Sequence, residues 1–315
     1  MFRLTTLTLT VAASLSACGG GGGDVSNGST VSSAGATATG AVDAVGSTTA
    51  TNNTGTTGSS AAANGGTGTG TGTGIEAGNT ASVAASATDC MITDDDVARI
   101  LQPYQVSETI YGQDGVTPTL TSETSYVTTA GATFKGFVGL YRQTISSTDR
   151  IYLNGIPTSS TARGVSSDYF GVTDTAILDY GTDHGRAGTR THSPPVSIPR
   201  RPSLNVAYKN TYVAVTEGSP IAEENISFAM TLFRTLVSIE QITVPAGTFQ
   251  ACKMLSVGIV ENGPVKGTTN QTTEWSVANG PYKGLPLKLI GETFDASGRS
   301  LSRSTNITTA LRLGN

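Results

Sequence analysis

The sequence predicts a mainly β fold, either an antiparallel curved sheet (a half-barrel) or a sandwich, with one short N-terminal helix preceded by a disordered tether. Beyond Gln105, short runs rich in Thr, Val, Ile, Tyr and Phe are separated by clusters of Gly, Pro, Asn and Asp. Apolar residues in these runs recur at every second position, as at Phe228, Met230 and Leu232, which gives each strand one apolar face. No helical pattern separates the runs, and this favours antiparallel strands.

The first 17 residues have the layout of a secretory signal peptide. A positive charge at Arg3 precedes an apolar stretch, which ends in the small residues Ser16 and Ala17. The stretch is too short for a transmembrane helix of about 20 residues. Residues 1–17 are therefore predicted to be removed on export.

The motif Leu15-Ser16-Ala17-Cys18 resembles the lipobox of bacterial lipoproteins. The resemblance implies that the Cys18 sulfur receives a diacylglycerol, that the chain is cut before Cys18, and that the new amino group is acylated. Two or more acyl chains hold a protein firmly, because each buried CH₂ contributes about 0.8 kcal/mol. Gly19 follows where aspartate marks inner-membrane retention in Gram-negative lipoproteins, and this implies the outer membrane. The alternative is an ordinary cleaved signal with a chance cysteine.

Residues 18–88 are predicted to be a disordered tether. From Gly19 to Thr88 the chain holds mainly Gly, Ser, Thr, Ala, Asn and Val, and it has no aromatic residue. Such a segment cannot bury enough apolar surface to offset a backbone entropy cost of ~1–2 kcal/mol per residue. As a flexible coil of about 70 residues it spans on the order of 45 Å, which is enough to hold a domain clear of a lipid surface.

A single β-rich domain is predicted for residues 89–315, and it begins with a short helix that Pro103 ends. Thr93 and Asp96 have the spacing of a capping box. The acidic residues 94–96 lack the ligand spacing and central glycine of an EF-hand loop, so a helix cap is favoured over a calcium site. The predicted apolar face of this helix consists of Val97, Ile100, Leu101 and Tyr104.

Alternation and turn signals predict the remaining elements. Leu204, Val206 and Tyr208 alternate with less apolar residues and predict a strand with one buried face. Residues 181–203 are rich in Gly and Pro and predict a long exposed loop between two groups of strands. Further strands are predicted at 122–129, 133–143, 162–170, 236–244, 248–261, 268–277, 285–294 and 300–312.

The segment Ile242-Thr243-Val244-Pro245-Ala246-Gly247-Thr248-Phe249, followed by Cys252-Lys253-Met254 and Thr273-Glu274-Trp275, resembles one that recurs in β-rich bacterial envelope proteins of uncharacterised function. Some of these proteins are similar in shape to the LolA/LolB-like lipoprotein carriers. The similarity covers residues 236–294. Pro245 and Gly247 predict a turn between two strands, after which Phe249 re-enters the core.

Cys90 and Cys252 would face an oxidising compartment after export, which permits a disulfide. Closing a loop of about 160 residues would contribute roughly 5 kcal/mol on the chain-entropy estimate. The alternative is a pair of buried thiols.

His184 and His192 are the two histidines of the chain, and Asp179, Asp183 and Ser193 lie close to them in sequence. No nucleophile elbow supports a catalytic triad, and two histidines eight residues apart match no common metal-ligand spacing. We therefore expect no catalytic, metal or cofactor site and place these residues on the surface loop. A hydrolase or a metal site using this loop are the alternatives.

Composition narrows the function. The net charge is −4 and 13% of residues are charged, so no basic face is expected and nucleic-acid binding is disfavoured. The leading hypothesis is a non-enzymatic envelope lipoprotein, periplasmic or surface-exposed, whose β-domain binds a hydrophobic ligand, namely a lipid, or binds a lipoprotein or another envelope protein. The second is a structural or adhesive surface module. Trp275 and the tyrosines either line a ligand cleft or belong to the core.

Overall fold

The computed structural model describes residues 86–218 and 225–314. The predicted signal peptide, the predicted lipidation site Cys18 and the predicted tether up to residue 85 lie outside the described residues. Over the described residues the chain is mainly antiparallel β-sheet, with one short α-helix and two 3-10 helices. The elements are η2 (Ala87–Cys90), α1 (Asp94–Ile100), β1 (Tyr104–Tyr111), β2 (Pro118–Phe134), β3 (Phe137–Leu153), β4 (Ile156–Val172), β5 (Ala176–Asp183), η3 (Gly185–Ala187), β6 (Thr189–Pro199), β7 (Ala207–Glu217), β8 (Ile226–Val244), β9 (Gly247–Val260), β10 (Thr269–Val277), β11 (Pro286–Phe294) and β12 (Ser300–Leu313).

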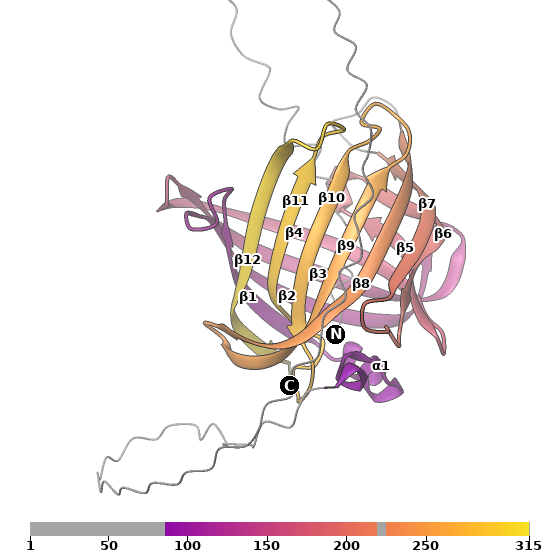
Figure 1. Cartoon of the computed structure of the whole chain (residues 1–315), viewed down its shortest axis with the longest axis horizontal. Helices are drawn as coiled ribbons and strands as arrows, with labels where there is room; N and C mark the ends of the chain where they lie inside the picture. The colour runs from indigo at the N-terminus through magenta and orange to yellow at the C-terminus, as the bar shows by residue number, and fades with distance from the viewer. Residues whose placement is uncertain (1–85, 219–224, 315) are drawn as a thin grey trace, which may run out of the picture. The chain divides into compact units, whose positions relative to one another are not determined.

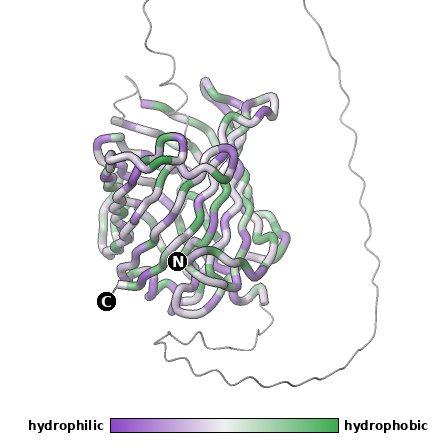
Figure 2. The backbone as a smooth tube through the Cα atoms, turned by 90° about the vertical axis from the view of Figure 1, so that its left-hand side faces the viewer, coloured by the Kyte–Doolittle hydropathy of each residue, from purple (hydrophilic) through white to green (hydrophobic). Residues whose placement is uncertain are grey.

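The strands form a closed barrel in which each strand pairs with its neighbours in the sequence and β1 pairs with β12 (Figure 1). Val106 in β1 is opposite Leu311 in β12 on one side and Thr124 in β2 on the other. The predicted mainly β, antiparallel and curved fold is confirmed. The sheet nevertheless closes completely, because both edges of β1 find a partner and no free edge is left between β1 and β12. Figure 2 shows hydrophilic and hydrophobic residues interleaved along the strands.

The helix α1 forms where the sequence predicts it. The Thr93 backbone N–H donates to Asp96 Oδ2 at 2.9 Å, and the Asp96 backbone N–H donates to Thr93 Oγ1 at 3.2 Å, which completes the capping box. Val97 packs against the apolar core of the barrel. Tyr104, predicted on the face of this helix, is instead the first residue of β1, because Pro103 separates the two elements.

Residues 90–100, called the plug below, close one end of the barrel. Ile92 is 3% exposed, and its side chain packs into the largest apolar cluster of the barrel interior. Two aromatic pairs stack there, Tyr104 with Tyr126 at a centroid distance of 4.3 Å and Tyr141 with Phe170 at 5.4 Å. The plug therefore closes this end of the barrel by apolar packing. The buried members of this cluster are Ile92, Tyr104, Val106, Tyr126, Phe170, Ile177, Ile198 and Leu285.

Buried Arg200 holds the plug in place with its backbone and side chain. Its carbonyl accepts the Ile92 N–H at 2.7 Å. Its guanidinium donates to the carbonyls of Ile92 at 3.1 Å and Thr173 at 3.0 Å, and to Asp94 Oδ1 at 2.6 Å. Lys283, between β10 and β11, also contacts the plug, because its Nζ donates to Asp96 Oδ2 at 2.8 Å.

The prediction of a long exposed loop at residues 181–203 is wrong. The segment contains the end of β5, the helix η3 and the strand β6, and both His192 and Arg200 are about 5% exposed. Opposite β5, the pairing of β6 skips from Thr191 to Val196, so the two consecutive prolines fall where no ladder hydrogen bond is needed from them. Proline is compatible with a strand at such a bulge, and this is why the proline signal did not mark a loop.

The predicted buried face at Leu204, Val206 and Tyr208 is also wrong. Leu204 and Val206 are 46% and 48% exposed, and β7 begins only at Ala207. Asn205 between them has a φ of 59° and donates its N–H to the Leu236 carbonyl at 2.8 Å. A turn with a left-handed residue breaks the alternation that a strand would need.

The hairpin between β8 and β9 confirms the predicted turn. Val244 is paired with Gly247, so Pro245 and Ala246 form the connection. The hairpin bends across the outside of β10–β12 (Figure 1), where Phe249 packs beside buried Trp275. Trp275 lies on the opposite face of β10 from Glu274 and donates its indole N–H to Glu240 Oε1 at 2.6 Å. Trp275 therefore belongs to a second core outside the barrel wall and does not line the interior.

Candidate functional site

The barrel interior contains a cavity of about 860 Å³ at the end away from the plug. In β1, Tyr104 and Val106 pack near the plug, whereas Glu108 and Ile110 farther along the same strand line the cavity. The other lining residues come from the facing parts of β2–β5, the residue after β5, and β10–β12. The plug thus closes the floor of the barrel, and the cavity occupies the space above it.

The walls of the cavity are rich in hydroxyl and amide groups. Ser122 and Thr124, on β2, share a hydrogen bond of 3.0 Å between their side-chain oxygens. Thr182 donates its hydroxyl to Asp168 Oδ1 at 2.7 Å, and Gln143 lines the wall beside Asp168 in the register of β3 and β4. These groups make the wall a polar surface with many donors and acceptors.

The cavity is acidic. Glu108, Asp149, Asp168 and Glu292 contribute carboxylates, and the described residues that line the cavity include no Lys or Arg. Of these carboxylates, Glu292 pairs with Arg303 at 3.6 Å. His184 also lines it, and burial lowers the pKa of this histidine, an effect that the charge of Arg190 strengthens and that of Asp183 opposes. The imidazole is therefore neutral at pH 7 and does not offset the carboxylates.

Two polar atoms of the cavity wall lack hydrogen-bond partners among the described residues, Asn270 Nδ2 and Asp149 Oδ1. Asn270 is 6% exposed, and its Oδ1 accepts a hydrogen bond from Thr293 Oγ1 at 3.0 Å, which fixes the amide on β10. A buried polar group without a partner costs about 1–3 kcal/mol. An unpaired donor and an unpaired acceptor in one cavity are therefore suited to a ligand that carries both kinds of group.

A separate polar cluster lies inside β5–β10 and contains Asp179, His192, Tyr212, Arg234 and Glu274. Asp179 Oδ2 is 3.5 Å from His192 Nδ1, and the imidazole meets the Tyr212 ring edge-on at 5.1 Å between centroids. Burial raises the pKa of Tyr212 to about 12, and the charge of Asp179 adds to this effect. Burial lowers the pKa of Arg234, which the charges of Glu274 and Asp179 oppose. The cluster thus brings buried groups of both charges together, and His192 Nδ1 and Arg234 Nε have no hydrogen-bond partner among the described residues.

The structure separates the residues that sequence reasoning grouped around the histidines. His192 points into the barrel, whereas Ser193, the next residue on β6, is exposed on the other side of the strand. A base and a nucleophile must be within hydrogen-bond reach, and neighbouring strand residues face opposite ways. His184 belongs to the cavity and His192 to the charge cluster. Over residues 86–218 and 225–314, no three His, Cys, Asp or Glu side chains converge as metal ligands would.

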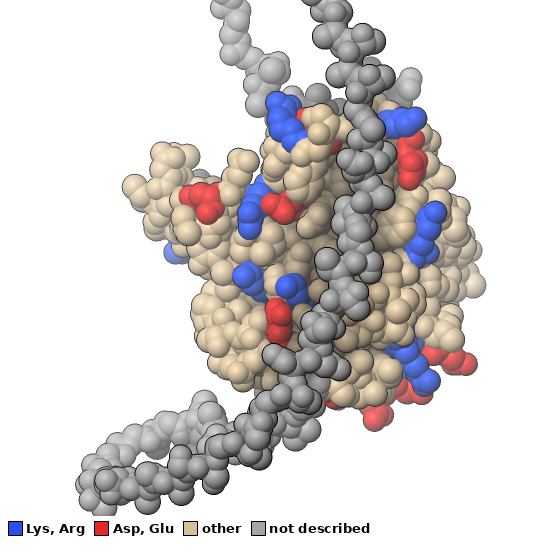
Figure 3. All heavy atoms as spheres, viewed as in Figure 1, with Lys and Arg blue, Asp and Glu red and all other residues tan. Residues whose placement is uncertain are grey.

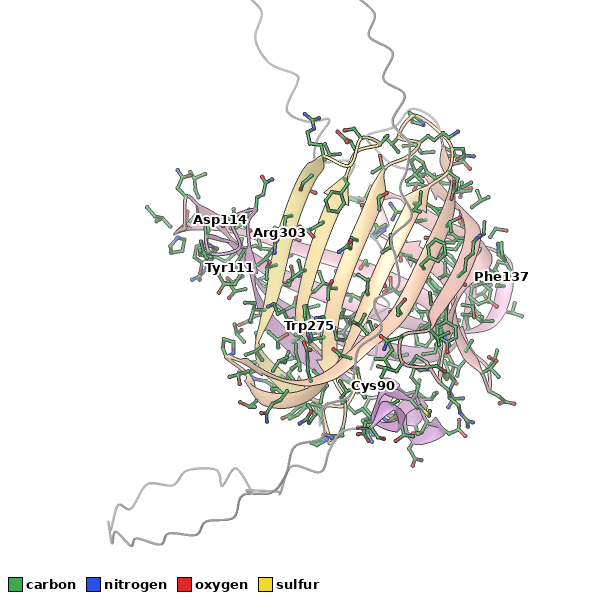
Figure 4. The ribbon with its side chains drawn as sticks, in the orientation of Figure 1. Cys90, Tyr111, Asp114, Phe137, Trp275 and Arg303 are labelled. Carbon is green, nitrogen blue, oxygen red and sulfur yellow. A yellow bond between two sulfur atoms is a disulfide. The ribbon has the colours of Figure 1, made fainter. Side chains whose placement is uncertain are left out.

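The structure joins Cys90 and Cys252 in a disulfide, with their Cα atoms 5.8 Å apart. Both residues are about 1% exposed and pack with Leu236, Met254 and Ala278. Figure 4 labels Cys90 beside α1, at the plugged end of the barrel. The bond thus ties the start of the plug to β9 in the barrel wall.

Sequence reasoning did not identify Asp149 and Asn270. Both lie in runs in which polar residues occupy inward and outward positions alike, such as Ser146 to Asp149, so alternation does not separate the faces.

On the face shown in Figure 3, Lys and Arg are interspersed with Asp and Glu. No helix in the described part of the chain is long and apolar enough to span a bilayer.

No protein-family profile and no curated protein sequence matches the chain. Two solved structures align with it. One is a candidate exported protein with a YmcC-like fold from Bacteroides fragilis, with 12% identity and a TM-score of 0.38, covering 66% of this chain and 95% of that chain. The other is a candidate lipoprotein from Parabacteroides distasonis, with 14% identity and a TM-score of 0.38, covering 67% of this chain and 95% of that chain. Neither likeness assigns an activity or a partner to this chain.

Proposed function

We propose that this chain is a lipid-anchored, non-enzymatic binding protein of the cell envelope that takes a small polar ligand into its barrel. One observation carries the proposal: the cavity holds a buried amide donor on Asn270 and a carboxylate acceptor on Asp149, neither of which has a partner among the described residues. A preformed concave site with a few convergent polar groups is typical of small-molecule binding.

Anchoring rests on the sequence around Cys18. The lipobox-like motif directs the attachment of lipid to Cys18, and Gly19 favours the outer membrane. The described residues begin at Ser86, just before η2 and the plug.

The cavity lining argues against a lipid as its occupant. An acyl chain needs an apolar wall, because buried polar groups that lose water without gaining a partner cost free energy. Most large apolar side chains of this barrel are packed in the core at the plug and in the outer core around Trp275. The cavity wall itself is mixed: it includes Ile110, Leu120, Tyr126, Ile145 and Leu289 beside a larger number of polar residues. A hydrolase using the segment of His184 and His192 would need a nucleophile beside one of these histidines, and Ser193 faces away from His192.

The anchor is tested by expressing the chain in a Gram-negative host fed radiolabelled palmitate. The native chain is expected to take up label and to fractionate with the outer membrane. The Cys18→Ala variant is expected to carry no label and to be released from the periplasm by osmotic shock. Equal labelling of the two chains would contradict the anchor.

The cavity is tested by filling it. A Cβ at Gly291 would meet Ser304 Oγ at 3.5 Å and Leu289 Cδ2 at 3.8 Å, which are ordinary contacts, so Gly291→Phe places a ring in the cavity without a backbone clash. Leu301→Phe is the matched control, because Leu301 is 47% exposed and does not line the cavity.

Thermal unfolding of each protein is measured with glucose, glucosamine, spermidine and citrate, and with anilinonaphthalene sulfonate as a hydrophobic probe. At least one polar compound is expected to raise the Tm of the native protein and of Leu301→Phe, but not of Gly291→Phe. Binding of the hydrophobic probe alone, lost in Gly291→Phe, would refute a polar ligand and support the lipid.

A further inference from the structure

We infer that the barrel docks onto a lipid bilayer through an apolar rim at its cavity end, formed by Val116, Ile151, Leu153 and Ile156 and called the rim below. The inference goes beyond the proposed ligand, and it rests on the proposed function only for the anchor that keeps a lipid surface within reach. It depends on the exposure of these side chains, on the two hairpins that present them and on the length of chain between the barrel and Cys18.

The rim continues the apolar part of the cavity wall beyond the cavity. Ile110 on β1 is opposite Leu120 on β2, and both residues line the cavity. Leu120 is in turn opposite Ile151 on β3, and Leu153 lies two residues farther along that strand. Residues two apart in a strand share a face, so Ile151 and Leu153 extend this row past the cavity.

A tight turn holds two aliphatic side chains at the tip of the hairpin between β3 and β4. Leu153 is paired with Ile156, and the two residues between them, Asn154 and Gly155, have φ angles of 52° and 78°. Positive φ angles at both central positions are typical of a type I′ turn, which suits the twist of the flanking strands. Paired residues have Cβ atoms about 5 Å apart, so the turn presents Leu153 and Ile156 together.

The hairpin between β1 and β2 lies beside this tip and adds Val116. A Cβ at Gly155 would be 3.7 Å from Thr117 Cγ2, so the two tips are within van der Waals distance. Asp114 Oδ1 accepts the backbone N–H groups of Val116 at 3.0 Å and Thr117 at 2.9 Å, which fixes the turn. Figure 1 shows this hairpin projecting beyond the barrel, and Figure 4 labels Tyr111 and Asp114 at it.

The rim is exposed although it is apolar. Val116 is 73% exposed, Leu153 and Ile156 are each 68% exposed, and Ile151 is 41% exposed. Single apolar residues are ordinary on a protein surface, but a group of them on two touching hairpin tips is typical of an interaction site.

The anchor makes a bilayer the surface that the rim meets. The predicted tether between Cys18 and Ser86 spans on the order of 45 Å as a flexible coil, so the lipid surface that holds Cys18 stays within reach of the barrel. Tethering raises the effective concentration of the rim at that surface, so a weak contact is sufficient.

The side chains of the rim suit acyl chains. Aliphatic side chains bind a bilayer by burying apolar area at the boundary between headgroups and acyl chains, and this needs no matching pocket. Tyr111 ends β1 beside the rim, and Tyr152 lies between Ile151 and Leu153 in the sequence. Tyrosine is enriched at membrane–water interfaces, where its ring is apolar and its hydroxyl remains hydrated.

The test is flotation of the Cys18→Ala chain with vesicles of phosphatidylethanolamine and phosphatidylglycerol. This chain carries no lipid at residue 18, so vesicle binding reports on the protein itself, and the anchor and the rim fail separately. The variant is Leu153→Ser with Ile156→Ser. The matched control is Val138→Ser with Val165→Ser, because these residues lie on the same two strands and are 75% and 64% exposed.

The Cys18→Ala chain is expected to float with the vesicles. The rim variant is expected to bind them on the order of 10-fold more weakly, because two large aliphatic side chains no longer enter the bilayer. The control variant is expected to bind as the Cys18→Ala chain does.

A fluorescent label locates the contact. Cys90 and Cys252 are joined in a disulfide, so a thiol introduced by Val116→Cys in the Cys18→Ala chain is the one that takes an environment-sensitive nitrobenzoxadiazole dye. Vesicles are expected to shift its emission to shorter wavelength, as entry into an apolar surrounding does. The same dye at Val138→Cys is expected to show no shift.

Equal weakening of vesicle binding in the two double variants would overturn the assignment to the rim. Failure of the Cys18→Ala chain to bind vesicles would overturn the lipid contact, while ligand uptake, measured by the Tm, would stand or fall by itself. Self-association in place of vesicle binding, lost in Leu153→Ser with Ile156→Ser, would show that a second copy of the chain covers the rim and would also overturn the proposal.

Discussion

The two ends of the barrel use the same strands in opposite ways. At the plugged end, Tyr104 and Val106 of β1 pack against Ile92, and a disulfide and buried Arg200 fasten the plug to the wall. At the cavity end, Glu108 of the same strand faces a polar space with unpaired groups. Apolar packing and satisfied polar contacts stabilise the plugged end, whereas under the proposed function the unpaired groups of the cavity bind a ligand. Stability and binding are thus assigned to different ends of one sheet, and substitutions at the two ends should have different consequences.

The largest effect on stability is expected from removing the disulfide at the plugged end. Cys90 and Cys252 are 162 residues apart in the sequence, and a bond that closes so long a loop restricts the unfolded chain. The double variant Cys90→Ser with Cys252→Ser should lose about 5 kcal/mol of unfolding free energy on the chain-entropy estimate. Urea unfolding of both proteins, with and without reductant, measures it. If the reductant destabilised the double variant as much as the native protein, the disulfide would not be the cause.

The next largest effect is expected at Arg200. The variant Arg200→Met keeps much of the side-chain volume but removes the donors to the carbonyls of Ile92 and Thr173 and the pairing with Asp94. Leaving these acceptors without partners should cost about 3 kcal/mol. Exposed Arg201 provides the control, and Arg201→Met should change the unfolding free energy by less than about 0.5 kcal/mol. Equal losses in the two variants would show that Arg200 does not fasten the plug.

A smaller, pH-dependent effect is expected at Asp96. Burial raises the pKa of this carboxyl, but hydrogen bonds from Lys283 and Thr93 outweigh it and hold the pKa below its ordinary value. A lowered pKa in the folded state means that the carboxylate stabilises the protein above the unfolded-state value of about 3.9, and that this contribution is lost as the pH falls through the folded-state pKa.

The variant Asp96→Asn should therefore be less stable than the native protein by about 1 kcal/mol near pH 7, as loss of a helix cap and its partner predicts. The difference should shrink below about pH 4. Asp95→Asn, in the same helical turn but exposed, should show a smaller difference across this range. Unfolding curves between about pH 3 and pH 7, a range chosen to cover carboxyl titration, measure the stability difference of each variant from the native protein. A constant difference at every pH would contradict the role of the ionised Asp96.

The smallest effect on stability is expected in the cavity. The side chain of Asp149 forms no hydrogen bond or ion pair with the described residues, so Asp149→Asn removes no side-chain contact that supports the fold. Its unfolding free energy should be within about 0.5 kcal/mol of the native value. Urea unfolding without added amine or sugar measures this change. A loss as large as that of Arg200→Met would show that the cavity end also stabilises the barrel.

Two of the predictions that depended on residues close in sequence are confirmed. The capping box of Thr93 and Asp96 and the turn between Val244 and Gly247 depend on hydrogen bonds within a few residues, so the local pattern specifies them. The error at His192 arose because Pro194 and Pro195 were taken as signs of a loop. Whether two prolines fit in β6 depends on how β6 pairs with β5, and the residues around the prolines do not specify that pairing.

The candidate site was beyond the reach of the sequence for a related reason. Asp149 and Asn270 lie on β3 and β10, and only barrel closure brings their strands around one space. Each residue by itself resembles an ordinary polar residue of a solvated strand. An inward carboxylate and an inward amide become informative only when it is known that they face the same cavity.

The sequence by itself determined the β class, the short capped helix, the hairpin turn at Pro245 and the residues on which the prediction of an anchor rests. The tertiary structure decided that β1 pairs with β12, that residues 90–100 fill one end, and that the other end encloses a polar cavity. The physical reason is the range of the interactions. Caps, turns and alternation depend on neighbouring residues, whereas closure depends on the tilt and stagger of all the strands together.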